Sequence, residues 1–165
     1  MAATILVRYR GETMRTILIS FDADWFERLE TGGLFYEYRK NFPAEPVRAY
    51  FYISKPAMCV SGIAEFGQRE LLETWLEKYK HKPAVLERVN DYLTDCRYAI
   101  PIVSFQPTNR IRLPELRSVP GFVVPRMYYF LDNSELLQYL EDNIKPSAGM
   151  IINDFSKLKD DDICQ

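Results

Sequence analysis

The chain has 165 residues, enough for one domain with a hydrophobic core, and its 47% hydrophobic content excludes an intrinsically disordered protein. A formal net charge of −2 excludes a broadly basic nucleic-acid-coating protein, although a small basic cleft on an acidic body is compatible with it. The three cysteines form no CxxC pair and a single histidine accompanies them, so we expect reduced thiols and no metal or other cofactor.

The start of the chain predicts a strand followed by a short helix. "RTILISF", residues 15–21, is rich in β-branched and large apolar side chains, as buried strands are. In "DADWFERLETGG" an aspartate can cap a helix, an apolar stripe follows, and two glycines end it. Trp25, Phe26 and Leu29 make up that stripe. The start contains neither a signal peptide nor an 18-residue apolar run, so we expect a cytoplasmic protein that does not contact membranes.

The middle of the chain predicts two strands and then two helices. The strands are expected at 47–54 and 57–67, with Gly62 as a candidate bulge. Apolar residues at helical spacing predict helices at 68–80 and 83–95.

The last third predicts two strands, one helix and a tail. The stretch 96–105 has strand character, although Pro101 indicates an edge strand or a bulge. A long loop follows, then a strand at 123–131 and a capped amphipathic helix at 132–144. After it, the sequence shows no clear period and ends with enough charge to be mobile.

The stretch "TGGLFYEYRKNFP" contains the first candidate site. Glu37 and Arg39 lie two residues apart, which places them on one face of a strand, and Lys40 follows. Two interpretations remain open at this point: a solvated surface ion pair, or a pair that points into a binding cleft. Between residues 34 and 55, four Lys/Arg and two Glu alternate with tyrosines, a composition suited to base stacking and phosphate contact.

A second basic group extends from the long loop into the strand expected at 123–131. It contains four arginines, Arg110, Arg112, Arg117 and Arg126. Either this is a solvated loop, or it folds over the first group and completes a basic rim around Glu37. Nucleophilic catalysis has little support, because the lone His81 lies between two helices and no Walker, GxGxxG or HExxH motif occurs.

The stretch "ILISFDADWFERLETGGLFYEYRKNFP" resembles the opening of ASCH domains, relatives of the PUA superfamily. Their signature is a strand, a short helix and Gly-x-Lys-x-x-Glu-x-Arg, which Gly32, Glu37 and Arg39 match. "CRYAIPIVSF" resembles the family's alanine-bearing strand, and the resemblance covers residues 14–144. It implies an ASCH/PUA-like domain over these residues. Residues 1–13 are then an N-terminal extension that either joins the sheet or is mobile, and 145–165 form a C-terminal tail.

The resemblance breaks at the family's lysine, whose place is taken by Leu34. In members similar to N4-acylcytidine amidohydrolases, that lysine and a glutamate on the alanine-bearing strand carry the chemistry. Here "YAIPI" has no carboxylate, and a leucine can neither act as a base nor stabilise an oxyanion. The departure moves the expectation from catalysis to binding.

We therefore predict an α+β fold, a PUA-like mixed, mostly antiparallel β-barrel of about five or six strands with surrounding helices. We expect the domain to bind RNA or a modified nucleotide or nucleoside, as a regulator of transcription or translation. The alternative is a nucleic-acid-processing hydrolase, a ribonuclease or an amidohydrolase-like enzyme, with Glu37 as general base. A protein partner could contact the 110–126 loop or the tail. The predicted ligand-binding residues are Glu37, Arg39, Lys40, Tyr52, Lys55, Arg110, Arg126 and Tyr128.

Overall fold

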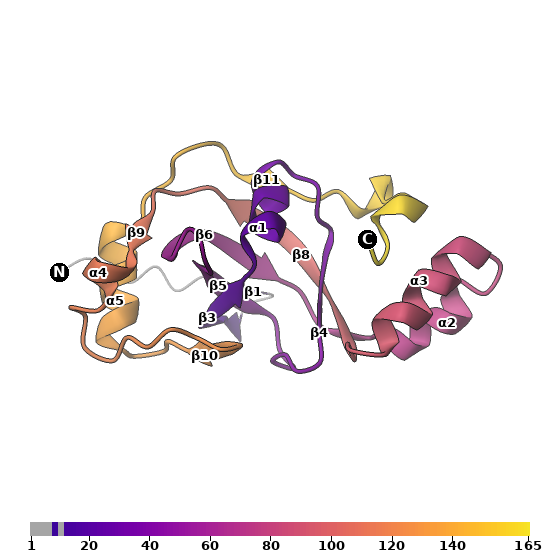
Figure 1. The fold of residues 1–165 in the computed structure, drawn as a ribbon, viewed down its shortest axis with the longest axis horizontal. Coiled ribbons are helices and arrows are strands. Elements are labelled where there is room, and N and C mark those ends of the chain that lie inside the picture. Colours follow the sequence, from indigo (N-terminus) through magenta and orange to yellow (C-terminus); the bar gives the residue numbers. More distant parts are fainter. Residues whose placement is uncertain (1–7, 10–11) are drawn as a thin grey trace.

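A curved mixed sheet runs through the molecule, with helices at both of its ends (Figure 1). The computed structural model describes residues 8–9 and 12–165, with side chains from Met14 onward. Six strands form a continuous path in the order β10-β3-β5-β6-β8-β11. They are β10 (Tyr128–Phe130), β3 (Arg15–Phe21), β5 (Val47–Ile53), β6 (Cys59–Phe66), β8 (Tyr98–Gln106) and β11 (Ile151–Ile152). Three short strands join the path from the side: β4 (Tyr36–Arg39) and β7 (Glu70–Leu71) pair with β8, and β9 (Ile111–Arg112) pairs with β6.

The pairing is antiparallel everywhere on this sheet except between β3 and β5. This confirms a mixed, mostly antiparallel α+β architecture. The predicted barrel is open, however, since no ladder of the described chain joins β10 to β11. The two end strands are short, with three residues in β10 and two in β11. The result is a curled half-barrel rather than a closed one.

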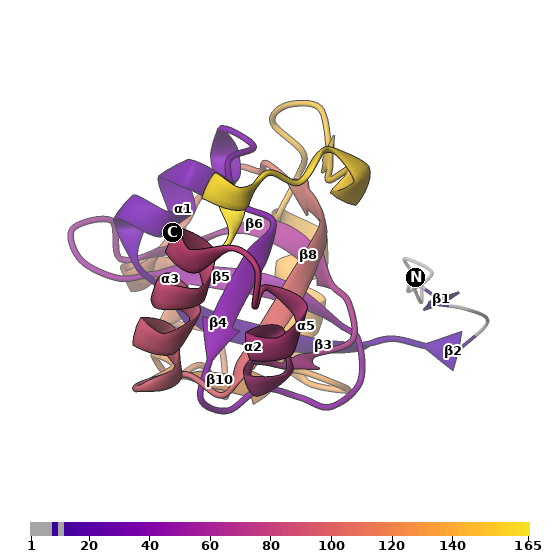
Figure 2. The same ribbon diagram turned by 90° about the vertical axis from the view of Figure 1, so that its right-hand side faces the viewer.

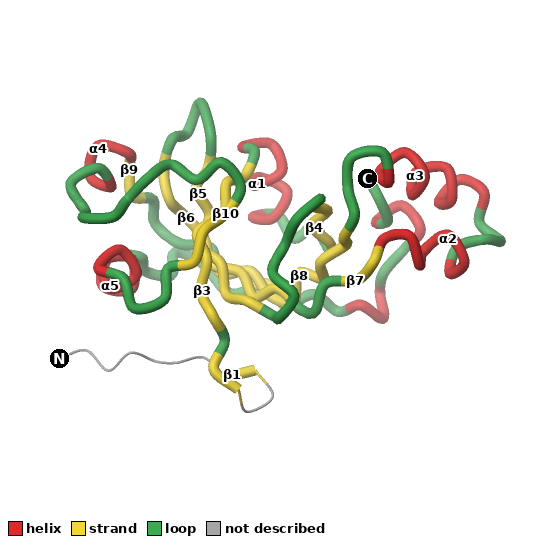
Figure 3. Tube along the Cα trace, turned by 90° about the horizontal axis from the view of Figure 1, so that it is seen from below, coloured by secondary structure: helices red, strands yellow, loops and turns green. Residues whose placement is uncertain are grey.

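The helices lie in three places around the sheet (Figure 3). The helix α1 (Ala23–Glu30) follows β3, the pair α2 (Trp75–Lys78) and α3 (Pro83–Leu93) lies at one end, and α4 (Leu113–Leu116) and α5 (Glu135–Asn143) lie at the other. Asp22 caps α1 by accepting hydrogen bonds from the Asp24 and Trp25 N–H groups, and Gly32 follows its end with a φ of 79°. Within the described residues, no helix combines the length and apolarity needed to cross a membrane.

Each group of helices covers its own part of the core. One cluster joins α1 to the sheet through Phe26, Leu29 and Phe51, and a second joins α4 and α5 to the opposite side of β3 and β5. The alternation along β3 explains this division, because neighbouring side chains of a strand point to opposite faces. The third cluster packs α2 and α3 against β4, around the buried Trp75.

The bulge expected at Gly62 is confirmed. Tyr50 pairs with Ile63 and Phe51 with Ser61, so Gly62 is the extra residue of β6. Its φ of 77° favours glycine, and a Cβ at this position would lie 2.7 Å from the Phe105 ring. The bulge therefore needs glycine for both conformation and space.

Three sequence-based boundaries differ from the structure. The helix expected at 68–80 is divided into β7, the short 3₁₀ turn η1 (Leu72–Thr74) and α2, because Glu70 and Leu71 pair with β8. Pro101 does not make β8 an edge strand, since partners lie on both sides, although the ladder with β6 has a bulge two residues further on. The strand expected at 123–131 is limited to β10, and the loop before it extends to Met127.

The segment from residue 145 to 165 packs against the domain, which its sequence did not predict. After β11 it forms two 3₁₀ turns, η2 (Phe155–Lys157) and η3 (Asp160–Asp162). Ile163 and Cys164 are each 1% exposed in the third cluster. Figure 2 shows this part of the chain, in yellow, beside α3. Of the N-terminal extension, the structure describes only the hairpin of β1 (Arg8–Tyr9) and β2 (Glu12–Thr13); residues 1–7 and 10–11 lie outside the described residues.

The three thiols are expected to differ in their reactivity. Cys59 and Cys164 are buried, and burial raises the pKa of Cys164 to about 11, whereas Cys96 is only half-buried. The thiolate is the reactive form, so iodoacetamide at pH 8 should label Cys96 first and Cys164 only after unfolding. Mass spectrometry of tryptic peptides measures the order. Early labelling of Cys164 would contradict the packed position of the C-terminal segment.

Candidate ligand site around Glu37 and Arg39

Glu37 and Arg39 lie on one face of β4, as period-two spacing predicts, while Tyr36 and Tyr38 point to the other face. The Arg39 Nε donates to Glu37 Oε1 at 2.9 Å. The Arg39 Nη2 donates to the Ser20 carbonyl at 2.7 Å. The Glu37 side chain is only 16% exposed and the Arg39 side chain only 21%. The pair is therefore not the solvated surface ion pair of the first interpretation.

The pair lines a cavity of about 260 Å³. The end of β3 and the start of α1 form one wall, with Asp22 and Trp25. The strand β4 forms the base, α3 and the residue Cys96 after it form a second wall, and the C-terminal segment adds Asp162 and Gln165. Segments separated by more than a hundred residues in the sequence therefore meet around Glu37.

Burial raises the pKa of the Glu37 carboxyl above its usual range, and the neighbouring Arg39 guanidinium opposes this effect without cancelling it. Removal from water penalises the charged form of a carboxyl group. A raised pKa in a cavity is typical of groups that bind a ligand or transfer a proton.

This shift makes a prediction for stability against pH. Because the pKa of Glu37 is higher in the folded than in the unfolded state, its protonated form stabilises the fold at low pH. That contribution should be lost as pH rises from the ordinary carboxyl range through the folded-state pKa. Urea denaturation measures this effect. The free energy of unfolding of the wild type minus that of Glu37→Gln should be larger at pH 4 than at pH 7. A larger difference at pH 7 than at pH 4 would mean that Arg39 lowers the pKa of Glu37 overall.

Three of the other predicted residues lie outside the cavity. Lys40 is exposed and lines a neighbouring depression that shares Cys96 with it. Lys55 is exposed in the turn between β5 and β6. Tyr52 is only 3% exposed and packs in the second core cluster, so the expectation that it offers a stacking face is wrong.

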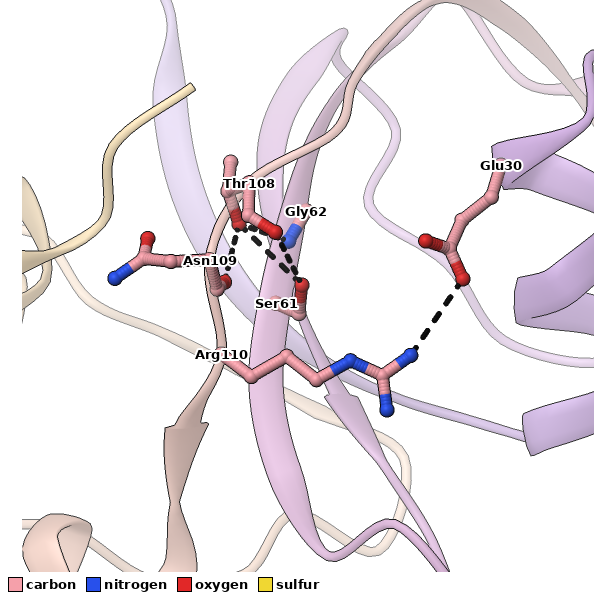
Figure 4. Close-up of polar contacts among 6 residues, drawn as sticks. All are labelled: Glu30, Ser61, Gly62, Thr108, Asn109 and Arg110. Atoms are coloured by element: carbon pink, nitrogen blue, oxygen red, sulfur yellow. Dashed lines mark hydrogen bonds and ion pairs between the residues drawn. The ribbon is translucent and has the colours of Figure 1, made fainter. Parts of the chain in front are cut away.

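The arginine-rich loop does not fold over Glu37. Arg110 forms an ion pair with Glu30, the last residue of α1, at 3.6 Å (Figure 4). Two residues before Arg110, the Thr108 hydroxyl oxygen accepts a hydrogen bond from the Gly62 N–H. The loop instead buries Ile111 and other apolar residues against the second cluster. Arg110 therefore does not belong to a rim around Glu37, and its exposed ion pair contributes less than about 1 kcal/mol.

Arg126 and Tyr128 do not line the cavity either. Arg126 is exposed and precedes Met127, whose carbonyl accepts from the Ser20 N–H. The Ser20 carbonyl in turn accepts a hydrogen bond from Arg39, so the loop that contains Arg126 and the Arg39 side chain both contact Ser20. Tyr128 packs on the first core cluster with its ring centroid 6.0 Å from that of Phe42.

Four of the cavity residues are not predicted from the sequence as site residues. Trp25 was assigned to the apolar stripe of its helix, yet it is 37% exposed while its neighbour Phe26 is buried. Cys96, Asp162 and Gln165 reach the cavity only through tertiary packing.

The fold is similar to that of known proteins. The ASCH protein of Zymomonas mobilis superposes with a TM-score of 0.63 at 21% identity, over 80% of this chain and 97% of that one. Its tyrosine-to-phenylalanine variant has a TM-score of 0.62 at 20% identity, over 79% of this chain and 99% of that one. Its serine-to-alanine variant gives the same TM-score and identity, over 79% and 97%. The chain has the fold of an ASCH domain. No family model and no curated protein sequence matches it.

The departure from the ASCH signature has a structural counterpart. Leu34, at the position of the signature lysine, is 6% exposed and packs in the first core cluster while also lining the cavity. Its carbonyl accepts from the Asn153 side chain at 2.8 Å, so the C-terminal segment also fixes this position. The ASCH-like cavity of this chain thus has an apolar side chain where the signature has a cation.

Proposed function

We propose that the Glu37 cavity binds a single base of single-stranded RNA or a modified nucleoside. The observation that supports this most directly is the combination of a part-exposed Trp25 with the mostly buried Glu37–Arg39 pair in one cavity. Its volume of about 260 Å³ lies below the range of roughly 300–1,000 Å³ of sites for drug-sized ligands, and so suits one base or nucleoside. The ASCH-like fold also supports the proposal, since the sequence resemblance carries the same expectation.

Trp25 provides the stacking face in place of Tyr52 and Tyr128. The Arg28 guanidinium lies 4.6 Å from the centroid of the Trp25 ring, and this contact limits the rotation of the indole while leaving it 37% exposed. A base stacked on an aromatic side chain contributes about 1–3 kcal/mol to binding. Stacking depends little on the sequence of the RNA, so selection must come from the polar groups.

Glu37 and Arg39 supply those polar groups. A carboxylate accepts hydrogen bonds from the N–H donors of a base edge. The guanidinium has five N–H groups, of which one is donated to Glu37 and one to Ser20, and others remain for a phosphate or carbonyl oxygen. The bond to Ser20 holds the guanidinium in place before any ligand arrives.

Equilibrium binding of labelled single-stranded RNA, single-stranded DNA and nucleosides tests the proposal. We expect the oligonucleotides to bind at low salt and more weakly as salt rises, with a log–log slope of about −0.7 to −1.5, because few cations adjoin the cavity. Glu37→Gln should weaken binding about tenfold, whereas Glu30→Gln, which removes the surface partner of Arg110, should leave it unchanged. If no RNA or nucleoside binds even at low salt, the proposal is wrong.

A hydrolase remains a second candidate because of the raised pKa of Glu37. A carboxyl pKa shifted towards neutrality suits general acid–base catalysis. Incubation with labelled RNA and with N4-acetylcytidine, for wild type and Glu37→Gln, distinguishes the two functions. Turnover that is lost in the variant would support an enzyme, and binding without turnover would support a binding domain.

A further inference from the structure

The C-terminal segment is a fixed part of the cavity wall rather than a loose end beside it. On α3, Arg88 donates to the carbonyl of Asp160 at 2.6 Å and to that of Ile163 at 3.0 Å. Lys82 pairs with the Asp160 carboxylate at 2.6 Å. Main-chain carbonyls and a carboxylate of the segment are therefore held by Arg88 of α3 and by Lys82, the residue just before this helix.

The end of the segment is anchored equally closely to the site. The Cys164 N–H donates to the Tyr38 hydroxyl at 2.9 Å, and the Tyr92 hydroxyl donates to the main-chain carbonyl of Gln165. Ile163 and Cys164 are each 1% exposed, so apolar packing reinforces the hydrogen bonds. The contact with Tyr92 uses the main chain of Gln165, so the Gln165 side chain is not used for anchoring and lines the cavity.

The side chain of Gln165 has one hydrogen-bonding group without a partner. Its Nε2 donates to Asp162 Oδ1 at 3.3 Å, but its Oε1 is buried and accepts no hydrogen bond within the described part of the chain. A buried acceptor without a donor is destabilising, and in native proteins it usually has a role or a missing partner. Gln165 lines the cavity, so a rotation of its amide, which is held by the 3.3 Å bond to Asp162, would bring Oε1 to a ligand there that supplies the partner.

The charges around the cavity indicate which kind of ligand group would do so. Asp22, Glu37 and Asp162 bring three carboxylates, and Arg39 is the one cation among the described lining residues. Negative charges therefore outnumber positive charges among the described lining residues. A ligand with N–H donors complements this arrangement, whereas a ligand edge made only of acceptors would leave the Gln165 Oε1 unpaired.

We propose that Gln165 is a specificity-determining residue that accepts a hydrogen bond from an amino group of the bound base. The inference rests on the proposed function and extends it. The cavity then selects bases with an exocyclic amino group over equally stackable bases without one. Trp25 provides affinity for either kind of base, and the C-terminal segment distinguishes between them.

Two pairs of nucleosides that differ in one amino group test this selection: adenosine with purine riboside, and cytidine with pyrimidin-2-one riboside. In titrations with the full chain, we expect the amino-bearing member of at least one pair to bind about three- to tenfold more tightly. Gln165→Ala should reduce that ratio to about one, because the methyl side chain accepts no hydrogen bond.

Gln138→Ala is the matched control, because Gln138 is exposed on α5 and binds only Asp142 among the described side chains. It should change neither affinity nor ratio. If the wild type binds nucleosides and Gln165→Ala keeps the same ratio, the inference is wrong while the proposed function stands. If the wild type binds none of the four, both the proposed function and this inference are contradicted.

Discussion

Arg39→Ala is expected to weaken RNA or nucleoside binding by about a hundredfold and to reduce the free energy of unfolding by about 2 kcal/mol. The guanidinium joins Glu37 to the Ser20 carbonyl, so its removal leaves a carboxylate in the cavity without its countercharge. Breaking a fully buried pair costs about 3–5 kcal/mol. The smaller value applies here because both side chains keep some contact with water. Urea denaturation and equilibrium binding measure the two effects.

A double-mutant cycle with Glu37→Gln identifies the cause of the lost stability. If the unpaired carboxylate is responsible, Glu37→Gln combined with Arg39→Ala should be more stable than Arg39→Ala alone. Arg39→Lys keeps the positive charge, but an ammonium group lacks the planar fork that contacts Glu37 and the Ser20 carbonyl together. Compared with Arg39→Ala, it should restore more of the free energy of unfolding than of the binding affinity. Equal stability of the single and double variants at pH 7 would contradict the role assigned to the pair.

Trp75→Ala is expected to reduce the free energy of unfolding by about 3–5 kcal/mol, the cost of truncating a large buried aromatic residue. The indole is 1% exposed in the third cluster. Its ring centroid lies 4.9 Å from that of Tyr36 and 6.1 Å from that of Tyr38, so it supports the face of β4 opposite to Glu37. A cavity at Trp75 should therefore loosen the strand that positions the site. Urea denaturation measures the stability and equilibrium binding the affinity.

The second tryptophan is the control for this prediction. Trp25→Ala removes a 37% exposed ring and should change the free energy of unfolding by less than about 1 kcal/mol. It should nevertheless weaken binding about tenfold or more, because the stacking face is lost. The two tryptophans thus separate stability from binding. Similar losses of stability in both variants would contradict their different burial.

The sequence was sufficient where a local pattern determines the structure. Alternation placed Glu37 and Arg39 on one face of β4, and the aspartate and glycines around α1 marked both of its ends. The bulge at Gly62 followed from a glycine inside a strand. Each of these depends on residues within a few positions of one another.

Tertiary packing decided the features that the sequence did not predict. Glu70 and Leu71 have helical spacing with the residues after them, but pairing with β8 places them in a strand. Whether Arg110 would reach Glu37 depended on the path of a long loop, and the burial of Ile111 directs that loop away. The position of Gln165 depends on contacts with α3, more than seventy residues earlier.

The fluorescence of Trp25 provides the most direct test of base binding in the Glu37 cavity. Titration of the full chain with single-stranded RNA at low salt should quench tryptophan emission, because a stacked base lies against the part-exposed ring. Trp25→Phe retains only the buried Trp75 and should show no quenching over the same range. Quenching of equal size in wild type and Trp25→Phe, or RNA binding with unchanged emission in the wild type, would contradict base stacking in this cavity.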